Sequence, residues 1–213
     1  MRNTLRVELW KATHNRMFFL SLAVGLFLAL GDSYLSWLTV TELHQSTLEM
    51  LAHGYGRGGH AGYSLFVLWM PINGFQITTI YFFLIWPALA AMPYGWSYGQ
   101  ERNSGVTQQI TTRSGKRTYF NAKFISVFIS GGFAVFLPIL INLLVDAMIC
   151  PYALPKLGIV PVFNGNFLSA LYYTNPWVYA ICWCMMEFLF GGAAACLCFV
   201  VGSMLKVRLV TIL

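Results

Sequence analysis

Long apolar runs alternate with short polar segments along this chain. A membrane-spanning helix needs about 20 predominantly apolar residues, and four runs reach that length: residues 17–40, 75–96, 124–150 and 177–205. Residues 63–70 are apolar but too short to cross, and Pro71, Asn73 and Gly74 follow them, so we expect an outer interfacial segment there. Residues 207–213 have the composition of the start of a fifth span. Either the natural protein ends there or the chain is a fragment of a longer protein, and we expect the fragment.

The composition supports lipid rather than water as the main solvent. Of the 213 residues, 58% are hydrophobic and 9% are charged, whereas an ordinary soluble domain is about 45–50% apolar and about 25% charged. So few charges cannot cover the surface of a soluble domain of this size. We therefore predict an all-α fold, a polytopic transmembrane helical bundle that forms one membrane domain over residues 1–213.

The basic residues give this bundle an orientation. Cytoplasmic loops are enriched in Lys and Arg, and eleven of the thirteen bases lie before the first span, between the second and third, or after the fourth. These are Arg2, Arg6, Lys11, Arg16, Arg102, Arg113, Lys116, Arg117, Lys123, Lys206 and Arg208, and the other two are Arg57 and Lys156. The amino terminus is therefore predicted to be cytoplasmic, with outer loops at residues 41–74 and 151–176. No nucleic-acid partner is expected for the net charge of +6, because the bases form no continuous basic face.

Residues 2–16 have an amphipathic pattern. Leu5, Leu9 and Ala12 share one helical face that two arginines flank, which predicts an interfacial helix. A disordered basic leader that only sets the orientation is the alternative.

The first 31 residues also have features of a secretory signal peptide: a basic start, an apolar stretch and a small-residue site at residues 29–31. We favour a first span instead, because the apolar run continues through Leu35, Trp37 and Leu38 and cleavage would remove most of it.

Residues 99–123 form the one substantial cytoplasmic loop that the topology predicts. A short helix is expected over residues 102–110, with Asn103 or Ser104 as its cap and Gly105 weakening it. The order of residues in the loop is more informative than its polarity. Residues 101–110 read ERNSGVTQQI, and residues 114–123 read SGKRTYFNAK at the entry to the third span.

This order resembles the type 2 family of ABC transporter permeases. In that family a Glu, a Gly four residues later, a short helix, a Ser/Arg turn and an aromatic-x-x-Ala/Gly-Lys step join the second and third spans. The basic lead-in and the span order are similar too, although the family usually has six spans. The sequence departs from the family at two points: Val106 replaces the common Thr, and no Pro stands before Ser114.

The resemblance implies a permease subunit of an ATP-driven exporter in the bacterial plasma membrane. It would pair with a second permease chain, the same or homologous, and move a peptide antibiotic, drug or lipid by alternating access. Cytoplasmic ABC ATPase subunits would hold ATP and Mg²⁺, because no phosphate-cradling Gly-x-x-x-x-Gly-Lys-Ser/Thr motif occurs in this sequence; no cofactor and no enzymatic activity are expected on the chain itself. The residues that would couple to the ATPase are Glu101, Arg102, Gly105, Gln108, Gln109, Ile110 and Arg113.

Three carboxylates, Asp32, Asp146 and Glu187, lie within the predicted spans. A charged acid at the middle of a bilayer costs several kcal/mol, so these side chains should face protein or water, or stay protonated. One interpretation is a substrate cavity that prefers cationic or polar amphiphiles. The alternative is a set of hydrogen-bonded acids in helix packing.

Metal and disulfide chemistry are not predicted. His44, His53 and His60 lie in a Gly-rich outer loop, but their spacing matches no compact zinc pattern. Four of the five cysteines fall in the fourth span as two pairs about 21 Å apart along a helix, so they are interpreted as packing residues. Cys150 stands alone near the outer surface.

Two further segments have clear patterns. Small residues at 191–195 and 202 allow close helix approach, in a dimer interface or in internal packing. Residues 151–176 contain four prolines and cannot form one helix; a cap with a short helix within 166–173 is expected. Two other functions stay open, a non-transporting scaffold or sensor whose polar loop binds a regulatory partner, and, less favoured, an intramembrane enzyme.

Overall fold

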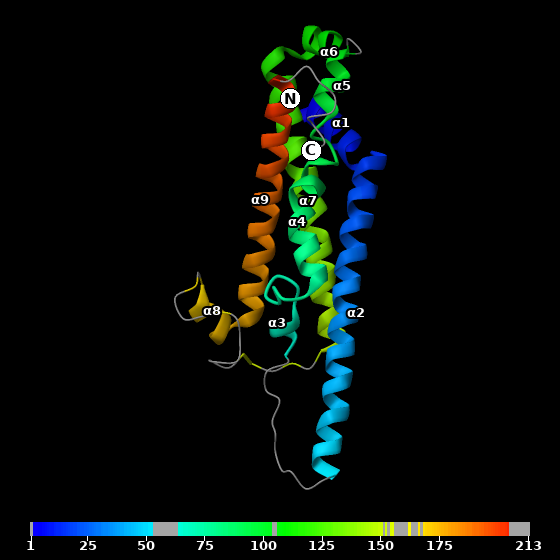
Figure 1. Cartoon of the computed structure of the whole chain (residues 1–213). Coiled ribbons are helices and arrows are strands. Elements are labelled where there is room, and N and C mark those ends of the chain that lie inside the picture. Colours follow the sequence, from blue (N-terminus) through cyan, green and yellow to red (C-terminus); the bar gives the residue numbers. More distant parts are fainter. Residues whose placement is uncertain are drawn as a thin grey trace. The chain divides into compact units, whose positions relative to one another are not determined.

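The fold is known from a computed structural model. It describes residues 2–52, 64–103, 106–150, 152, 154–155, 162, 166 and 168–204. The described residues form helices and contain no strand (Figure 1). The helices are α1 (Arg2–Thr13), α2 (Arg16–Ala52), α3 (Leu65–Leu68), α4 (Ile77–Ala91), α5 (Ser97–Asn103), α6 (Val106–Ser114), α7 (Lys116–Ile149), α8 (Ser169–Thr174) and α9 (Pro176–Met204). The all-α prediction is confirmed.

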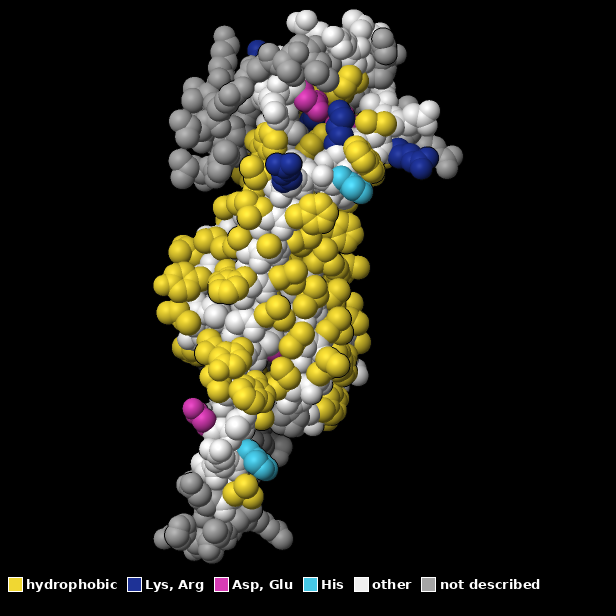
Figure 2. Space-filling model, turned by 90° about the vertical axis from the view of Figure 1, so that its right-hand side faces the viewer, with side chains coloured by type: hydrophobic (Ala, Val, Ile, Leu, Met, Phe, Trp, Pro, Cys, Tyr) yellow, Lys and Arg dark blue, Asp and Glu magenta, His cyan; other side chains and the backbone are white. Residues whose placement is uncertain are grey.

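Three helices are long and apolar enough to cross a membrane: Arg16–Ser46 within α2, all of α7 and all of α9. They correspond to the first, third and fourth predicted spans. Large hydrophobic side chains such as Phe27 and Leu197 are exposed on them, and Figure 2 shows hydrophobic side chains gathered over the middle part of the face in view. Such an exposed apolar surface is typical of a membrane protein.

The second predicted span is wrong in its bounds. A helix through residues 75–96 was expected, but α4 has 15 residues and is followed by a turn over residues 92–96. Pro93 lacks a backbone N–H. A Cβ at Gly95 would lie 2.7 Å from the carbonyl oxygen of Ala91, so the chain turns where only glycine fits.

The chain folds as two compact units, each built from segments that are distant in the sequence. Unit 1 comprises residues 1–25, 83–138 and 185–213, and unit 2 comprises residues 26–82 and 139–184. The prediction of a single membrane domain over the whole chain stays a prediction.

In unit 1, α7 and α9 cross at glycines. A Cβ on Gly132 would lie 2.7 Å from the carbonyl oxygen of Phe188, and a Cβ on Gly192 would lie 2.8 Å from that of Phe128. Any larger residue would push the two backbones apart. Gly192 therefore serves internal packing, and a dimer interface at the other small residues of the fourth span stays a prediction.

In unit 2, the short apolar segment before Pro71 is buried. Leu65, Phe66 and Leu68 of α3 are almost inaccessible, and the carbonyl oxygen of Phe66 accepts a hydrogen bond from Tyr172 Oη at 2.9 Å. This packing shows why the segment is apolar although it is short; an interfacial position stays a prediction. Helix α8 overlaps the range predicted for a short helix before the last span and ends one residue beyond it, so the presence of that helix is confirmed and its interfacial position stays a prediction.

Candidate functional site at the polar end of unit 1

Residues 99–123 are mostly helical rather than a solvated loop. The single helix expected over residues 102–110 is wrong, because α5 and α6 are separate helices. Ser104 and Gly105, which separate them in the sequence, have low helix propensity; both lie outside the described residues, as do the expected cap at Ser104 and the proposed coupling role of Gly105. Gly115 joins α6 to α7 with φ +81°, a left-handed conformation that favours glycine.

Four charged side chains from α1, α5 and α7 meet in unit 1. Lys123 Nζ lies 2.7 Å from Glu101 Oε2 and 3.2 Å from Glu8 Oε2. Lys11 Nζ lies 3.2 Å from Glu8 Oε1 and 3.4 Å from Glu101 Oε1. Two lysines therefore alternate with two glutamates, and we call these four residues the charge cluster. Its charges sum to zero.

Two tyrosines complete the charge cluster. Tyr94 Oη donates to Glu8 Oε2 at 2.8 Å, and Tyr119 Oη donates to Glu101 Oε2. Lys123 Nζ donates to Tyr94 Oη at 3.2 Å and lies 4.5 Å from the centroid of the same ring, in cation–π geometry. The side chain of Lys123 is 0% exposed, so these partners replace the water it has lost.

The pKa shifts show which charges the cluster stabilises. Burial raises the pKa of Glu101, but Lys123, Tyr119 and Lys11 lower it by more, so the net pKa lies below its ordinary value. Burial lowers the pKa of Lys11, but Glu8 and Glu101 raise it by more, so the net pKa lies above its ordinary value. Burial and the same two carboxylates raise the pKa of Tyr94. At neutral pH Glu101 is an anion, Lys11 is a cation and Tyr94 is a neutral donor.

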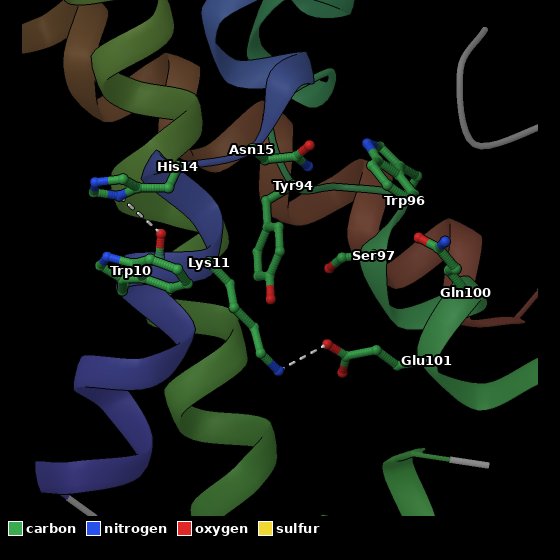
Figure 3. Close-up of a pocket in the computed structure, with 9 residues that line it drawn as sticks. All are labelled: Trp10, Lys11, His14, Asn15, Tyr94, Trp96, Ser97, Gln100 and Glu101. Carbon is green, nitrogen blue, oxygen red and sulfur yellow. Dashed lines mark hydrogen bonds and ion pairs between the residues drawn. The ribbon is translucent and has the colours of Figure 1, made fainter. Parts of the chain in front are cut away.

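A pocket of about 320 Å³ opens beside the charge cluster (Figure 3). Its lining residues are Trp10, Lys11, His14, Asn15, Tyr94, Trp96, Ser97, Gln100 and Glu101. Lys11 and Glu101 point toward each other across it, and the Trp10 ring stacks on His14 with centroids 5.0 Å apart. Ser97 Oγ is buried without a hydrogen-bond partner among the described residues. Paired charges, aromatic faces and an available hydroxyl suit the binding of a polar group or a partner side chain.

The predicted coupling residues separate into an inward and an outward set. Glu101 belongs to the charge cluster, whereas Arg102, Gln108 and Gln109 are exposed and Ile110 is half-buried. The side chain of Arg113 lies outside the described residues, although its backbone continues α6.

Sequence reasoning missed Lys123 and Glu8. Lys123 was counted as a base of the cytoplasmic loop and as the end of the permease-like motif, but α7 begins at Lys116 and carries it into the core. Glu8 lies three residues after Leu5 and four before Ala12, on the face that was assigned to the apolar side of the first helix. An acid on that face was the signal for a buried partner. The helix itself is confirmed as α1, with Trp10 exposed; its interfacial position stays a prediction.

The three acids proposed to line a substrate cavity fall in two different units, and the cavity itself stays a prediction. Glu187 belongs to unit 1, where Trp86 Nε1 donates to its Oε2 at 2.9 Å. Asp32 and Asp146 belong to unit 2 and are each 0% exposed. Glu187 and Asp32 fit the alternative of hydrogen-bonded acids in helix packing, whereas Asp146 does not, as described below.

The described part of the chain contains no group of three or more ligand side chains suited to a metal ion. His53 and His60 lie outside that part, as do Arg57, Lys156 and the expected start of a fifth span at residues 207–213. All five cysteines are free, including Cys150.

No protein-family model, characterised protein or solved structure matches this chain. The class that the fold defines is an all-helical protein with three helices of membrane-spanning length and composition, which indicates a membrane protein. The proposed function is therefore based on the charge cluster of unit 1.

Proposed function

We propose that the chain is a permease subunit of an ATP-driven ABC exporter. Its substrate would be hydrophobic or amphipathic, and ATP would be hydrolysed by cytoplasmic partner subunits. The observation that carries the proposal is the 2.7 Å ion pair between Glu101 and Lys123. Glu101 is the first residue and Lys123 is the last residue of the motif that resembles the type 2 permeases. Their ion pair joins the two ends of the loop, and a coupling element needs such a rigid base.

The charge cluster supports a mechanical role for this base. Glu8 and Lys11 attach α1 to both ends of the motif, so α1, α5 and the start of α7 share one set of ion pairs. Breaking a buried pair leaves an unpaired charge, which is strongly unfavourable. A displacement of α5 or α6 would therefore be transmitted to α7 and would not be lost in a flexible loop.

The exposed side chains of α5 and α6 would form the docking surface for the ATPase. Arg102 on α5 and Gln108 and Gln109 on α6 project polar groups outward, while Glu101 anchors α5 inward. The short amphipathic α6 would bind an ATPase, and the ATPase cycle would move α7 through the charge cluster. A second permease chain, the same or homologous, would complete the pathway.

The test is reconstitution from the native host membrane. The chain is purified with its partners, and ATP turnover is measured in proteoliposomes for the wild type and for the double variant Gln108→Ala, Gln109→Ala. Coupling energies of about 1–3 kcal/mol predict a loss of about 5-fold or more. The control Thr112→Ala changes another exposed residue of α6 and should keep wild-type turnover.

Two outcomes contradict the proposal. If no P-loop ATPase accompanies the chain, the non-transporting scaffold becomes the better function. If an ATPase accompanies it but turnover is the same in the double variant, this surface does not couple.

A further inference from the structure

Unit 2 contains a second buried polar group, built around Asp32 of α2. Asp32 Oδ1 accepts hydrogen bonds from Thr78 Oγ1 at 2.6 Å and Thr79 Oγ1 at 3.0 Å, and Asn142 Nδ2 donates to Oδ2 at 3.5 Å. Three donors directed at one carboxylate stabilise its ionised form. The described residues of α4 and α7 therefore supply Asp32 with three hydrogen-bond donors.

The orientation of Asn142 is fixed by its other bonds. Its Oδ1 accepts from the backbone N–H of Met70 at 3.2 Å, and its Nδ2 also donates to Ala29 O at 3.1 Å and Ser33 Oγ at 2.9 Å. The amide thus presents donors to Asp32 and Ser33. A metal ion would require oxygen ligands at this position, so the amide orientation disfavours a metal.

Asp146 lies one helical turn after Asn142, on the same face of α7. It is 0% exposed, and both of its carboxylate oxygens are buried without a well-formed hydrogen bond from the described residues. Its polar neighbours are the Ser33 hydroxyl, which is close enough to act on it as a weak donor, and Asp32. The described residues of unit 2 include no Lys or Arg. A charged Asp146 would be an unpaired anion beside a second anion, which costs far more than protonation.

We propose that Asp146 is a proton-binding site that carries a proton at neutral pH while Asp32 stays ionised. The bound proton removes one of two adjacent negative charges and leaves the other to its three donors. Among the described residues, the titratable groups that face this site are Asp32 on α2 and Cys150, four residues later in the chain, whose backbone N–H donates to Asp146 O at 2.8 Å. Helix α4 contributes the Thr78 and Thr79 hydroxyls.

A line of polar side chains connects this pair with the surface of unit 2. Ser36 lies one turn after Asp32 on α2, and its Oγ accepts from Gln76 Nε2 at 3.4 Å. Gln76 is partly exposed, and its buried Oε1 has no hydrogen-bond partner among the described residues. The proton site does not depend on an ATPase partner and stands apart from the proposed transport function.

Infrared spectroscopy of the whole chain in lipid nanodiscs tests the proposal. At neutral pH the wild type should show the C=O stretch of a protonated carboxylic acid, shifted in D₂O. Asp146→Asn should remove one component of that band. The control Glu187→Gln changes the acid bonded to Trp86 and should leave the Asp146 component in place.

Each other outcome overturns the proposal. An unchanged band in Asp146→Asn means that the carboxyl is ionised in the wild type. A band that appears only after Na⁺ and K⁺ are replaced by a bulky organic cation means that the site holds a metal ion. Asn has nearly the shape of a neutral Asp, so failure of Asp146→Asn to fold, seen as a lost thermal transition, would mean that the negative charge is required.

Discussion

The two units accommodate buried charge in opposite ways. In unit 1, the buried Glu8 and the partly buried Glu101 are matched by two lysines, and tyrosine hydroxyls fill the remaining positions. In unit 2, Asp32 and Asp146 are equally buried, but no base of the described chain accompanies them. Ion pairing fixes how helices are joined, because each charge requires its partner. An unpaired acid is instead able to exchange an ion with its surroundings. For this reason we propose a mechanical role for unit 1 and a proton-binding role for unit 2.

The largest effect is expected for Lys123→Met in unit 1. It removes the most buried cation and leaves Glu8 and Glu101 with Lys11 alone, so we expect a loss of about 3–5 kcal/mol in the free energy of unfolding. Denaturant titration in detergent micelles measures the loss. Adding Glu101→Gln should recover part of it, because one buried anion disappears as well. Equal instability of the single and double variants would contradict charge balance as the cause.

A smaller effect is expected for Asp32→Asn in unit 2. The amide keeps one acceptor oxygen, but Thr78 and Thr79 no longer donate to an anion, so about 1–3 kcal/mol of stability should be lost. The same titration, with Asp146→Asn as the matched control, tests this expectation. Asp146→Asn should change stability much less, since it replaces a neutral acid with a neutral amide. The reverse order would assign the negative charge to Asp146.

The smallest effect is the pH dependence of unit 1. The pKa of Glu101 is lowered below its ordinary value of 4.5, so its stabilising contribution is present above 4.5 and is lost as the pH falls through the lowered pKa. The pKa of Lys11 is raised above its ordinary value of 10.5, so its contribution is complete below 10.5 and is lost as the pH rises through the raised pKa. Lys11 is about a third exposed, so water screens its pairs.

Thermal unfolding across the pH range measures both losses. Glu101→Gln should flatten the acid side of the profile, and Lys11→Met should flatten the alkaline side. A profile that is identical in the wild type and both variants would show that these pairs contribute nothing to stability.

The sequence predicts the helices better than their contacts. Apolar runs of sufficient length indicate α2, α7 and α9, because span length follows from composition alone. The end of α4 depends on a local turn around Pro93 and Gly95, which a hydropathy pattern does not resolve. Lys123 shows a deeper limit: its partners Glu8 and Glu101 come from distant parts of the chain, so its burial follows from tertiary packing. Asp32 and Asp146 were both recognised as costly acids, but their proximity depends on the packing of α2 against α7.

The shortness of α4 determines what surrounds its ends. Fifteen residues rise about 22 Å, whereas the hydrocarbon core of a bilayer is about 30 Å thick. Such a hydrophobic mismatch is relieved either by local thinning of the bilayer or by protein that covers the irregular backbone. In the turn after α4, Pro93, Tyr94 and Gly95 are buried by protein. In a membrane this backbone would therefore need no cover from lipid, so changes in acyl-chain length should affect this end of α4 little.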